Sequence, residues 1–360
     1  KIPERAKKSS SVFQHTREKI FIDLDQPRNP LQQPSPHDRR AKSPPHRDLA
    51  RRIPAKMDPD ELYTCRSQFW LGHYDLCLDE AKSIARRPMS AQLKAEREEF
   101  ILRALLAKGQ VDKVVRDAAS LSSPGAKAIG LRATYESSPD DEAARTSAVE
   151  SLQSMLADPE NSSSTSLQLT AAHVFLRHGM VREALQCVHH GSTMEHLSLT
   201  VQIYLRIDRI DLAREQLALM RQGDEDSVLT QLAGAYVDVA SGRSGASDAV
   251  HALASLSEQY GPSLSLMNAT ACAHMASGSM DKAWAALEEA AAMEGGSNDA
   301  DTLINTVVCK RHLGKGDSEI EPLLARLRAG HASNPFVQGL VRVEGAFERE
   351  ALKYRAESVA

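Results

Sequence analysis

The sequence predicts an all-α fold, a solenoid of antiparallel helix pairs that curves into a superhelix or a ring. From Glu61 onward, apolar residues recur at spacings of three and four, which is the period of a helix. Clusters of Gly, Pro and Ser interrupt this pattern every 10–20 residues, so the helices are short and closely connected. Aromatic residues make up only 4% of the chain, and Ala and Leu carry the apolar content. This composition suits close helix packing better than a β-sandwich.

The composition divides the chain into two regions. Residues 1–56 contain 8 of the 16 prolines and 14 Lys and Arg against 6 Asp and Glu, without a sustained apolar period. We expect a disordered basic tail there, and we favour a flexible or non-native extension over a segment that binds acidic lipid or nucleic acid. Met57 resembles a native start, and residues 57–360 form the predicted solenoid. That body holds 30 Lys and Arg against 42 Asp and Glu, an acidic balance that disfavours nucleic-acid binding.

A repeat supports the solenoid. Its best match runs from Asn268 to Met293, with the small residue Ala271 in the first helix, Gly278 at the turn and Ala283 five residues later. The small side chains let two helix backbones approach closely, and a glycine can adopt the left-handed conformation that ends the first helix. This spacing is typical of tetratricopeptide-like repeats.

Small or compact residues recur at the position of Ala283 in other repeats. These residues are Cys77, Val114, Ala184, Ala213, Ala249 and Ala283, with gaps of 37, 70, 29, 36 and 34 residues. The gap of 70 predicts an additional, degenerate pair formed by Pro124–Tyr135 and Asp140–Leu156. Asp208 stands where other repeats have the turn glycine. In the last repeat, the first helix begins near Asp301 and ends at Gly314. Uneven gaps predict uneven curvature, and an irregular helical bundle remains the alternative.

The sequence contains no motif for catalysis, cofactor binding or metal binding. It lacks a P-loop, a dinucleotide fingerprint, a zinc-protease motif and a nucleophile elbow. The adjacent His189 and His190 would point about 100° apart on a helix, which suits a shared metal badly. The five cysteines form no C-x-x-C pair, so we expect buried free thiols. We therefore predict a non-enzymatic protein without catalytic, cofactor-binding or metal-binding residues, without a small-molecule substrate and without a membrane span.

Several segments resemble the coatomer epsilon subunit family of the COPI vesicle coat. The most specific is Leu199–Met220, LTVQIYLRIDRIDLAREQLALM, which continues through Asp224 to Leu232. Four further segments add to the resemblance: Phe69–Tyr74, Asn268–Met275, His312–Lys315 and Ser333–Phe336. The resemblance covers residues 57–360, and the tail before them has no place in it.

The resemblance implies a structural role in Golgi-to-ER retrograde and intra-Golgi transport. The repeats would curl into a ring that clasps an extended element of the C-terminal region of the coatomer alpha subunit, together with the other coatomer subunits. The protein would be cytoplasmic and would reach Golgi and COPI-vesicle membranes peripherally, through the coat. Candidate partner contacts are polar residues of the first helices, namely Gln202, Arg206, Asn268 and Asn305. Their amides could bind an extended backbone or equally satisfy neighbouring helices.

Two other binding functions are the alternatives. A generic tetratricopeptide adaptor or co-chaperone would bind an extended peptide such as the acidic tail of a chaperone. That function needs cations on the first helix, and around Glu61–Gly72 only Leu62 and Arg66 occupy candidate positions. An RNA-binding helical repeat would need a basic concave face with stacking aromatics, which the acidic body opposes.

Overall fold

The computed structural model of the protein describes residues 60–191 and 193–357, and every regular element in these ranges is helical. The tail of residues 1–56 and Met57 lie outside the described residues. The α-helices are α2 (Tyr63–Trp70), α3 (Tyr74–Ser83), α4 (Ala91–Ala107), α5 (Val111–Ser120), α6 (Pro124–Ser137), α7 (Glu142–Ala157), α8 (Thr165–Arg177), α9 (Val181–Val188), α10 (Met194–Arg206), α11 (Ile210–Gly223), α12 (Val228–Ala240), α13 (Ala246–Tyr260), α14 (Leu264–Ser277), α15 (Met280–Ala292), α16 (Ala300–His312), α17 (Asp317–Gly330) and α18 (Pro335–Glu357). Short 3-10 turns lie at Ile84–Arg86, Gly242–Ser244 and Gly296–Asn298.

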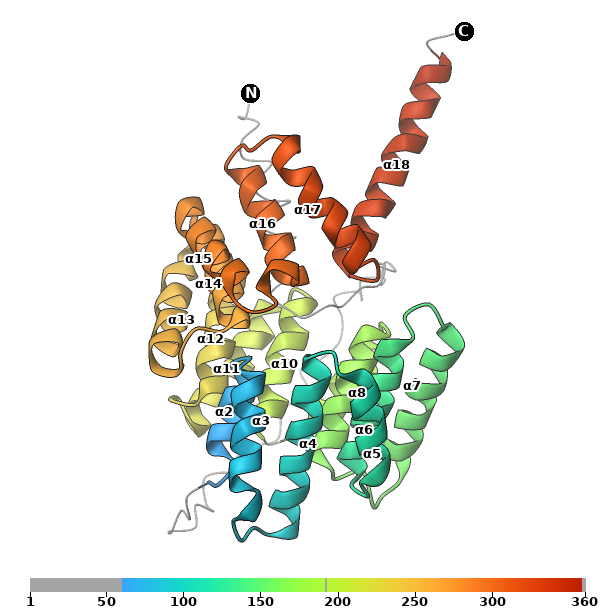
Figure 1. Cartoon of the computed structure of the whole chain (residues 1–360), viewed down its shortest axis with the longest axis vertical. Coiled ribbons are helices and arrows are strands. Elements are labelled where there is room, and N and C mark those ends of the chain that lie inside the picture. The colour runs from blue at the N-terminus through green and yellow to red at the C-terminus, as the bar shows by residue number, and fades with distance from the viewer. Residues whose placement is uncertain (1–59, 192, 358–360) are drawn as a thin grey trace, which may run out of the picture.

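Consecutive helices from α2 to α17 form antiparallel pairs, in which we call the first member helix A and the second helix B (Figure 1). The turn between A and B contains a residue with positive φ in every described pair except α6–α7. Six of these residues are glycines, and the seventh is Asp208, with φ of 61°. The residues at these turns are Gly72, Gly109, Gly179, Asp208, Gly242, Gly278 and Gly314. The predicted helix pairs and their turns are therefore confirmed, including the degenerate pair α6–α7.

The six residues predicted at the small position of helix B are all fully buried. Cys77 and Ala283, for example, each lie where helix B crosses a neighbouring helix A, in apolar clusters with Phe100 and with Ala271. A larger side chain at such a site would push two backbones apart. The small positions thus set the close approach of the helices.

Local signals mark where each kind of helix begins. Most helices A start with a capping side chain that accepts a hydrogen bond from a backbone N–H of the first turn, as Ser90 does from Leu93 at 3.2 Å. Helices B instead follow the tight turn directly, and most have no side-chain cap. The exception is α7, where Asp141 accepts from the Ala144 N–H at 3.0 Å. The one pair that lacks a left-handed turn residue therefore uses a cap in its place.

The stack closes on itself, because the first pair packs against helices far along the chain. Leu71 is only 1% exposed, and it lies in an apolar core built by α12, α13 and α14. The Ser263 hydroxyl donates to the Leu71 carbonyl at 2.5 Å, and His73 Nε2 lies 3.2 Å from the Gly261 carbonyl oxygen. We call these contacts the seam. They join residues about 190 positions apart and turn α2–α14 into a ring.

Beyond the seam, the stack continues through α16 and α17. Leu303 and Ile304 of α16 share an apolar cluster with Ile320 and Leu327 of α17 and with Val337 at the start of α18. Helix α18 then extends away from the body (Figure 1). None of the helices in the described ranges is long and apolar enough to cross a bilayer.

Candidate functional site

The helices A present polar side chains toward the inside of the ring. In α10, Glu195, Gln202 and Arg206 lie seven and four residues apart and therefore share one helix face. Glu195 reaches across to α2 and α4, which shows that this face points inward. We call the side chains on equivalent faces of α2, α4, α6, α8 and α10 the inner wall. It comprises Arg66, Trp70, Arg103, Arg132, Glu136, His173, Arg177, Glu195, Gln202 and Arg206.

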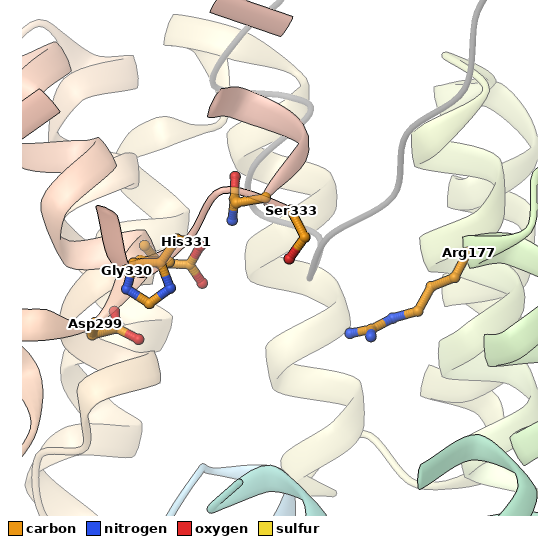
Figure 2. Close-up of a pocket in the computed structure, with 8 residues that line it drawn as sticks. Arg177, Asp299, Gly330, His331 and Ser333 are labelled. Atoms are coloured by element: carbon orange, nitrogen blue, oxygen red, sulfur yellow. The ribbon is translucent and has the colours of Figure 1, made fainter. Parts of the chain in front are cut away.

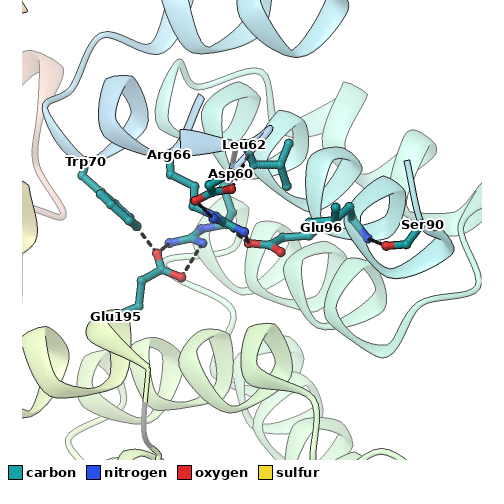
Figure 3. A network of polar contacts seen from close by, with 9 residues as sticks. Asp60, Leu62, Arg66, Trp70, Ser90, Glu96 and Glu195 are labelled. Carbon is teal, nitrogen blue, oxygen red and sulfur yellow. Dashed lines mark hydrogen bonds and ion pairs between the residues drawn. The ribbon is translucent and has the colours of Figure 1, made fainter. Parts of the chain in front are cut away.

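Glu195 joins three helices of the ring (Figure 3). The Trp70 indole N–H donates to Glu195 Oε1 at 2.9 Å, and the Arg103 guanidinium donates to the same oxygen at 2.7 Å. The Arg103 guanidinium also lies over the rings of Phe69 and Phe100, at 4.5 and 4.6 Å from their centroids. Each of these interactions limits the side-chain freedom of Arg103. The site is therefore pre-organised across residues that are 125 positions apart in the chain.

The charge state of Glu195 follows from its surroundings. Burial raises the pKa of this carboxyl, but the charge of Arg103 and the hydrogen bonds from Arg103 and Trp70 outweigh it, so the pKa is lowered. Glu195 is therefore ionised at neutral pH. Next to it, Arg66 is paired with Asp60 at 2.5 Å and with Glu96 at 2.8 Å (Figure 3).

A second charged group lines α6 and α8. Glu136 accepts from Arg132 at 2.7 Å and forms an ion pair with Arg177 at 3.1 Å. His173 lies half-buried beside these residues, and its pKa is lowered well below the usual value, first by desolvation and then by the charges of Arg132, Arg103 and Arg177. His173 is therefore neutral at pH 7. The inner wall here combines fixed guanidinium donors with a neutral imidazole.

The residues predicted to contact a partner fall into two places. Gln202 and Arg206 are half-buried on the inner wall. Asn268 and Asn305 are buried between α14 and α16, where Asn305 Nδ2 donates to Asn268 Oδ1 at 3.0 Å. Asn268 Nδ2 in turn donates to Thr302 Oγ1 at 2.8 Å. These two amides thus bind each other, and partner contact by any of the four residues stays a prediction.

A polar cleft of about 260 Å³ separates α8 from the start of α16 and the turn after α17. Arg177 points into it from one side, and Asp299, His331 and Ser333 line the other (Figure 2). Asp299 also caps α16, because its carboxylate accepts from the Thr302 N–H at 2.8 Å. The cleft therefore extends the inner wall toward the C-terminal pairs with opposite charges on its two sides.

Residues 60–191 and 193–357 contain no group of three or more His, Cys, Asp or Glu side chains arranged to hold a metal ion. The five cysteines are free thiols as predicted, but Cys187 is only half-buried, whereas the other four are buried. Cys65 and Cys77 lie in contact between α2 and α3, with their sulfurs 3.4 Å apart.

The sequence analysis missed Trp70, Arg103 and Glu195, which organise the inner wall. No local signal singles them out, since each of these helices A also carries other polar or charged residues. Helical periodicity also does not reveal that three residues from distant helices meet.

Comparisons with known proteins agree on one family. The family model of the coatomer epsilon subunit matches residues 58–355. The Arabidopsis thaliana protein coatomer subunit epsilon-1 is 33% identical over 293 residues, which cover 81% of this chain and 96% of the relative. The Dictyostelium discoideum coatomer subunit epsilon is 26% identical over 297 residues, covering 81% of this chain and 98% of the relative.

Among solved structures, the APC/C hetero-tetramer Cut9–Hcn1 resembles this chain with a TM-score of 0.53 and 15% identity. The match covers 78% of this chain and 55% of that one, and it supports the solenoid fold alone. The family model and the identity to curated relatives over nearly their whole length decide the assignment. The chain belongs to the coatomer epsilon subunit family.

Proposed function

We propose that the ring clasps an extended segment from the C-terminal region of the coatomer alpha subunit. As a member of its family, the chain is a structural subunit of the COPI coat and a partner of other coatomer subunits. The observation that carries the clasp is the Glu195 hub, where Trp70 and Arg103 from two other helices converge on one inner-wall carboxylate. A wall held together in this way keeps its shape before a partner arrives, which lowers the entropy cost of binding.

The chemistry of the inner wall supports an extended occupant. An extended segment exposes backbone carbonyl groups, and guanidinium and amide donors can bind these groups. Arg132 and Arg177 are held in place by Glu136, and Gln202 lies on the same wall two helices along. The interior has donors on several helices, so it can contact a segment along its length.

The same proposal includes a non-catalytic role, with a location in the cytoplasm and on Golgi and COPI-vesicle membranes. The chain would reach those membranes peripherally, through the other coat subunits. A co-chaperone function is less well supported, because Arg66, the cation that a carboxylate clamp would use, is already paired with Asp60 and Glu96.

The proposal is tested by calorimetric titration of the full chain with the recombinant C-terminal region of coatomer alpha. Changing Gln202 and Arg206 together to Ala removes inner-wall donors, and we expect at least about tenfold weaker binding. The matched control changes Arg221 and Gln222 to Ala. These two residues are exposed on helix B of the same repeat, and this variant should bind like the parent chain. Equal affinity of the inner-wall variant and the control would refute the clasp.

Asn268 provides a second comparison, because its amide is buried and occupied within the chain. Asn268→Ala leaves the Asn305 amide without its partner, which should cost about 1–3 kcal/mol of stability. We expect a lower denaturation midpoint in urea. A variant that binds the alpha segment more weakly without losing stability would instead place Asn268 in the binding surface.

A further inference from the structure

The seam joins the first helix pair to α12, α13 and α14 without a loop between its two sides. At the junctions between consecutive pairs, by contrast, a short stretch of chain holds the two neighbours together. Stacked repeats are stabilised mainly by contacts with their immediate neighbours, so each pair keeps its own core when a distant contact breaks. The seam is therefore a junction that can open while the helix pairs on both sides stay folded.

The apolar contact across the seam is small. Among the described residues of the first pair, Leu71 and Trp70 are the ones that take part in the apolar core of α12–α14. The same pair packs against α4 more extensively, in a cluster that contains Cys65, Phe69, Tyr74, Cys77, Leu78 and Ala81 together with Phe100, Ile101 and Ala104. The first pair is thus held more firmly to α4 than to α12–α14.

The other seam contacts are hydrogen bonds between groups that water can also bind. The Tyr63 and Tyr260 hydroxyls lie 3.4 Å apart at the exposed edge, and His73 and Ser263 bind backbone carbonyls as described above. In the described chain, the ion pairs of residues 60–83 do not reach α12–α14. Hydrogen bonds that are exchanged for bonds to water contribute only modestly to net stability. The polar contacts therefore add little resistance to opening.

The interior of the ring favours entry from the side. Glu195 of α10 binds Trp70 of α2 and Arg103 of α4, so these side chains span the interior at that level (Figure 3). A segment that slid in along the ring axis would have to pass them. An opened seam moves Trp70 away from Glu195 and admits a segment sideways, without either of its ends passing the hub.

We propose that the seam is the entrance of the ring: α2–α3 moves away from α12–α14, a segment of coatomer alpha enters, and the seam closes behind it. This inference rests on the proposed function of the ring and concerns how its occupant enters and leaves. The motion needs no single hinge, because small rotations between successive pairs add up along a solenoid. Opening then limits both the association and the dissociation of the occupant.

The test locks the seam with a cross-link that a reductant cleaves. Tyr63→Cys with Tyr260→Cys places two thiols at the edge of the seam, where a bismaleimide with an internal disulfide can join them. The background carries Cys187→Ser, because Cys187 is the one native thiol that is not buried. Surface plasmon resonance follows binding of the full chain to the recombinant C-terminal region of coatomer alpha, before and after cross-linking.

We expect the cross-link to slow association at least about tenfold, because the locked ring cannot open. A cross-link formed after the complex has assembled should slow dissociation at least about tenfold, because the occupant is enclosed. Cleavage of the linker should restore both rates. The matched control, Leu76→Cys with Asp79→Cys, joins two exposed positions within α3 and should keep both rates within about twofold of those of the chain without a cross-link.

The outcomes separate the entrance from the clasp. Unchanged rates in the cross-linked ring, with weak binding by the Gln202 and Arg206 variant, overturn the entrance and leave the clasp standing. Slower association with unchanged dissociation of the assembled complex also overturns the entrance, because it shows that the occupant is not enclosed. If the Gln202 and Arg206 variant binds like its Arg221 and Gln222 control, the clasp fails, and the entrance fails with it.

Discussion

The first helix pair and the last helix are both ends of one stack, but they have different surroundings. In α2–α3, Leu71 is buried against helices that follow it by more than 150 positions. In α18, Phe347 is 74% exposed and projects into solvent. The comparison shows that the curvature of the helix stack decides which of its two ends is covered by other helices of the same chain. Each helix pair has an apolar face that it cannot bury alone, so an end that does not meet its own chain keeps part of that face exposed.

The largest expected effect comes from loosening the seam. Leu71→Ala removes a fully packed side chain from the contact between the first pair and α12–α14, which should cost about 2–5 kcal/mol. Leu76→Ala is the matched control, since Leu76 lies in α3 of the same pair and is exposed. We expect the control to lie within about 0.5 kcal/mol of the parent chain. Similar urea denaturation curves for the two variants would mean that the ring does not depend on the seam.

A smaller effect should come from the Glu195 hub, and it should depend on pH. Glu195→Gln replaces charge-assisted hydrogen bonds with neutral ones, at a cost of about 1–3 kcal/mol at pH 7. Because the folded-state pKa of Glu195 is lowered, its stabilisation is complete above the unfolded-state pKa and is lost as the pH falls through the folded-state pKa. Urea unfolding at pH 7 and pH 3 should therefore show a difference at pH 7 that shrinks at pH 3. A difference of the same size at both pH values would contradict the ionised hub.

The smallest effect concerns Glu99 of α4, which is buried and accepts from the Ser123 hydroxyl at 2.8 Å. Burial raises the pKa of Glu99 despite that hydrogen bond. A raised folded-state pKa means that this group destabilises the fold as the pH rises. Glu99→Gln should therefore raise the thermal midpoint at pH 8, on the order of 1–2 °C, and change it less at pH 5. A lower midpoint at pH 8 would show that the carboxylate itself stabilises α4.

Much of the fold could be predicted because its determinants are local. A glycine five residues before a small residue defines a turn and a close helix crossing within one pair. The same five-residue spacing marks the turn at Asp208, where an aspartate instead of a glycine occupies the left-handed position. Serine, threonine and aspartate caps mark the starts of most helices A in the same local way. Such features depend only on residues a few positions apart.

The candidate site was predictable only in part. Gln202 and Arg206 lie on the inner wall as expected of helix A residues, but Asn268 and Asn305 pair with each other between neighbouring helices. Each helix A has one face toward the ring interior and another face toward the next helix A. The helical period of the sequence does not show on which of these two faces a polar residue lies. The hub of Trp70, Arg103 and Glu195 also depends on how far the stack curves.

By itself, the sequence determined that the chain would form paired helices with tight turns, because helix period, caps, left-handed turn residues and small contact positions all act over a few residues. Only the tertiary structure decided that Leu71 meets α12–α14, that Glu195 receives two donors from distant helices and that Phe347 of α18 is exposed among the described residues. The physical reason is that small rotations between successive pairs add up along the stack. Their sum, which no single repeat specifies, decides which distant surfaces come into contact.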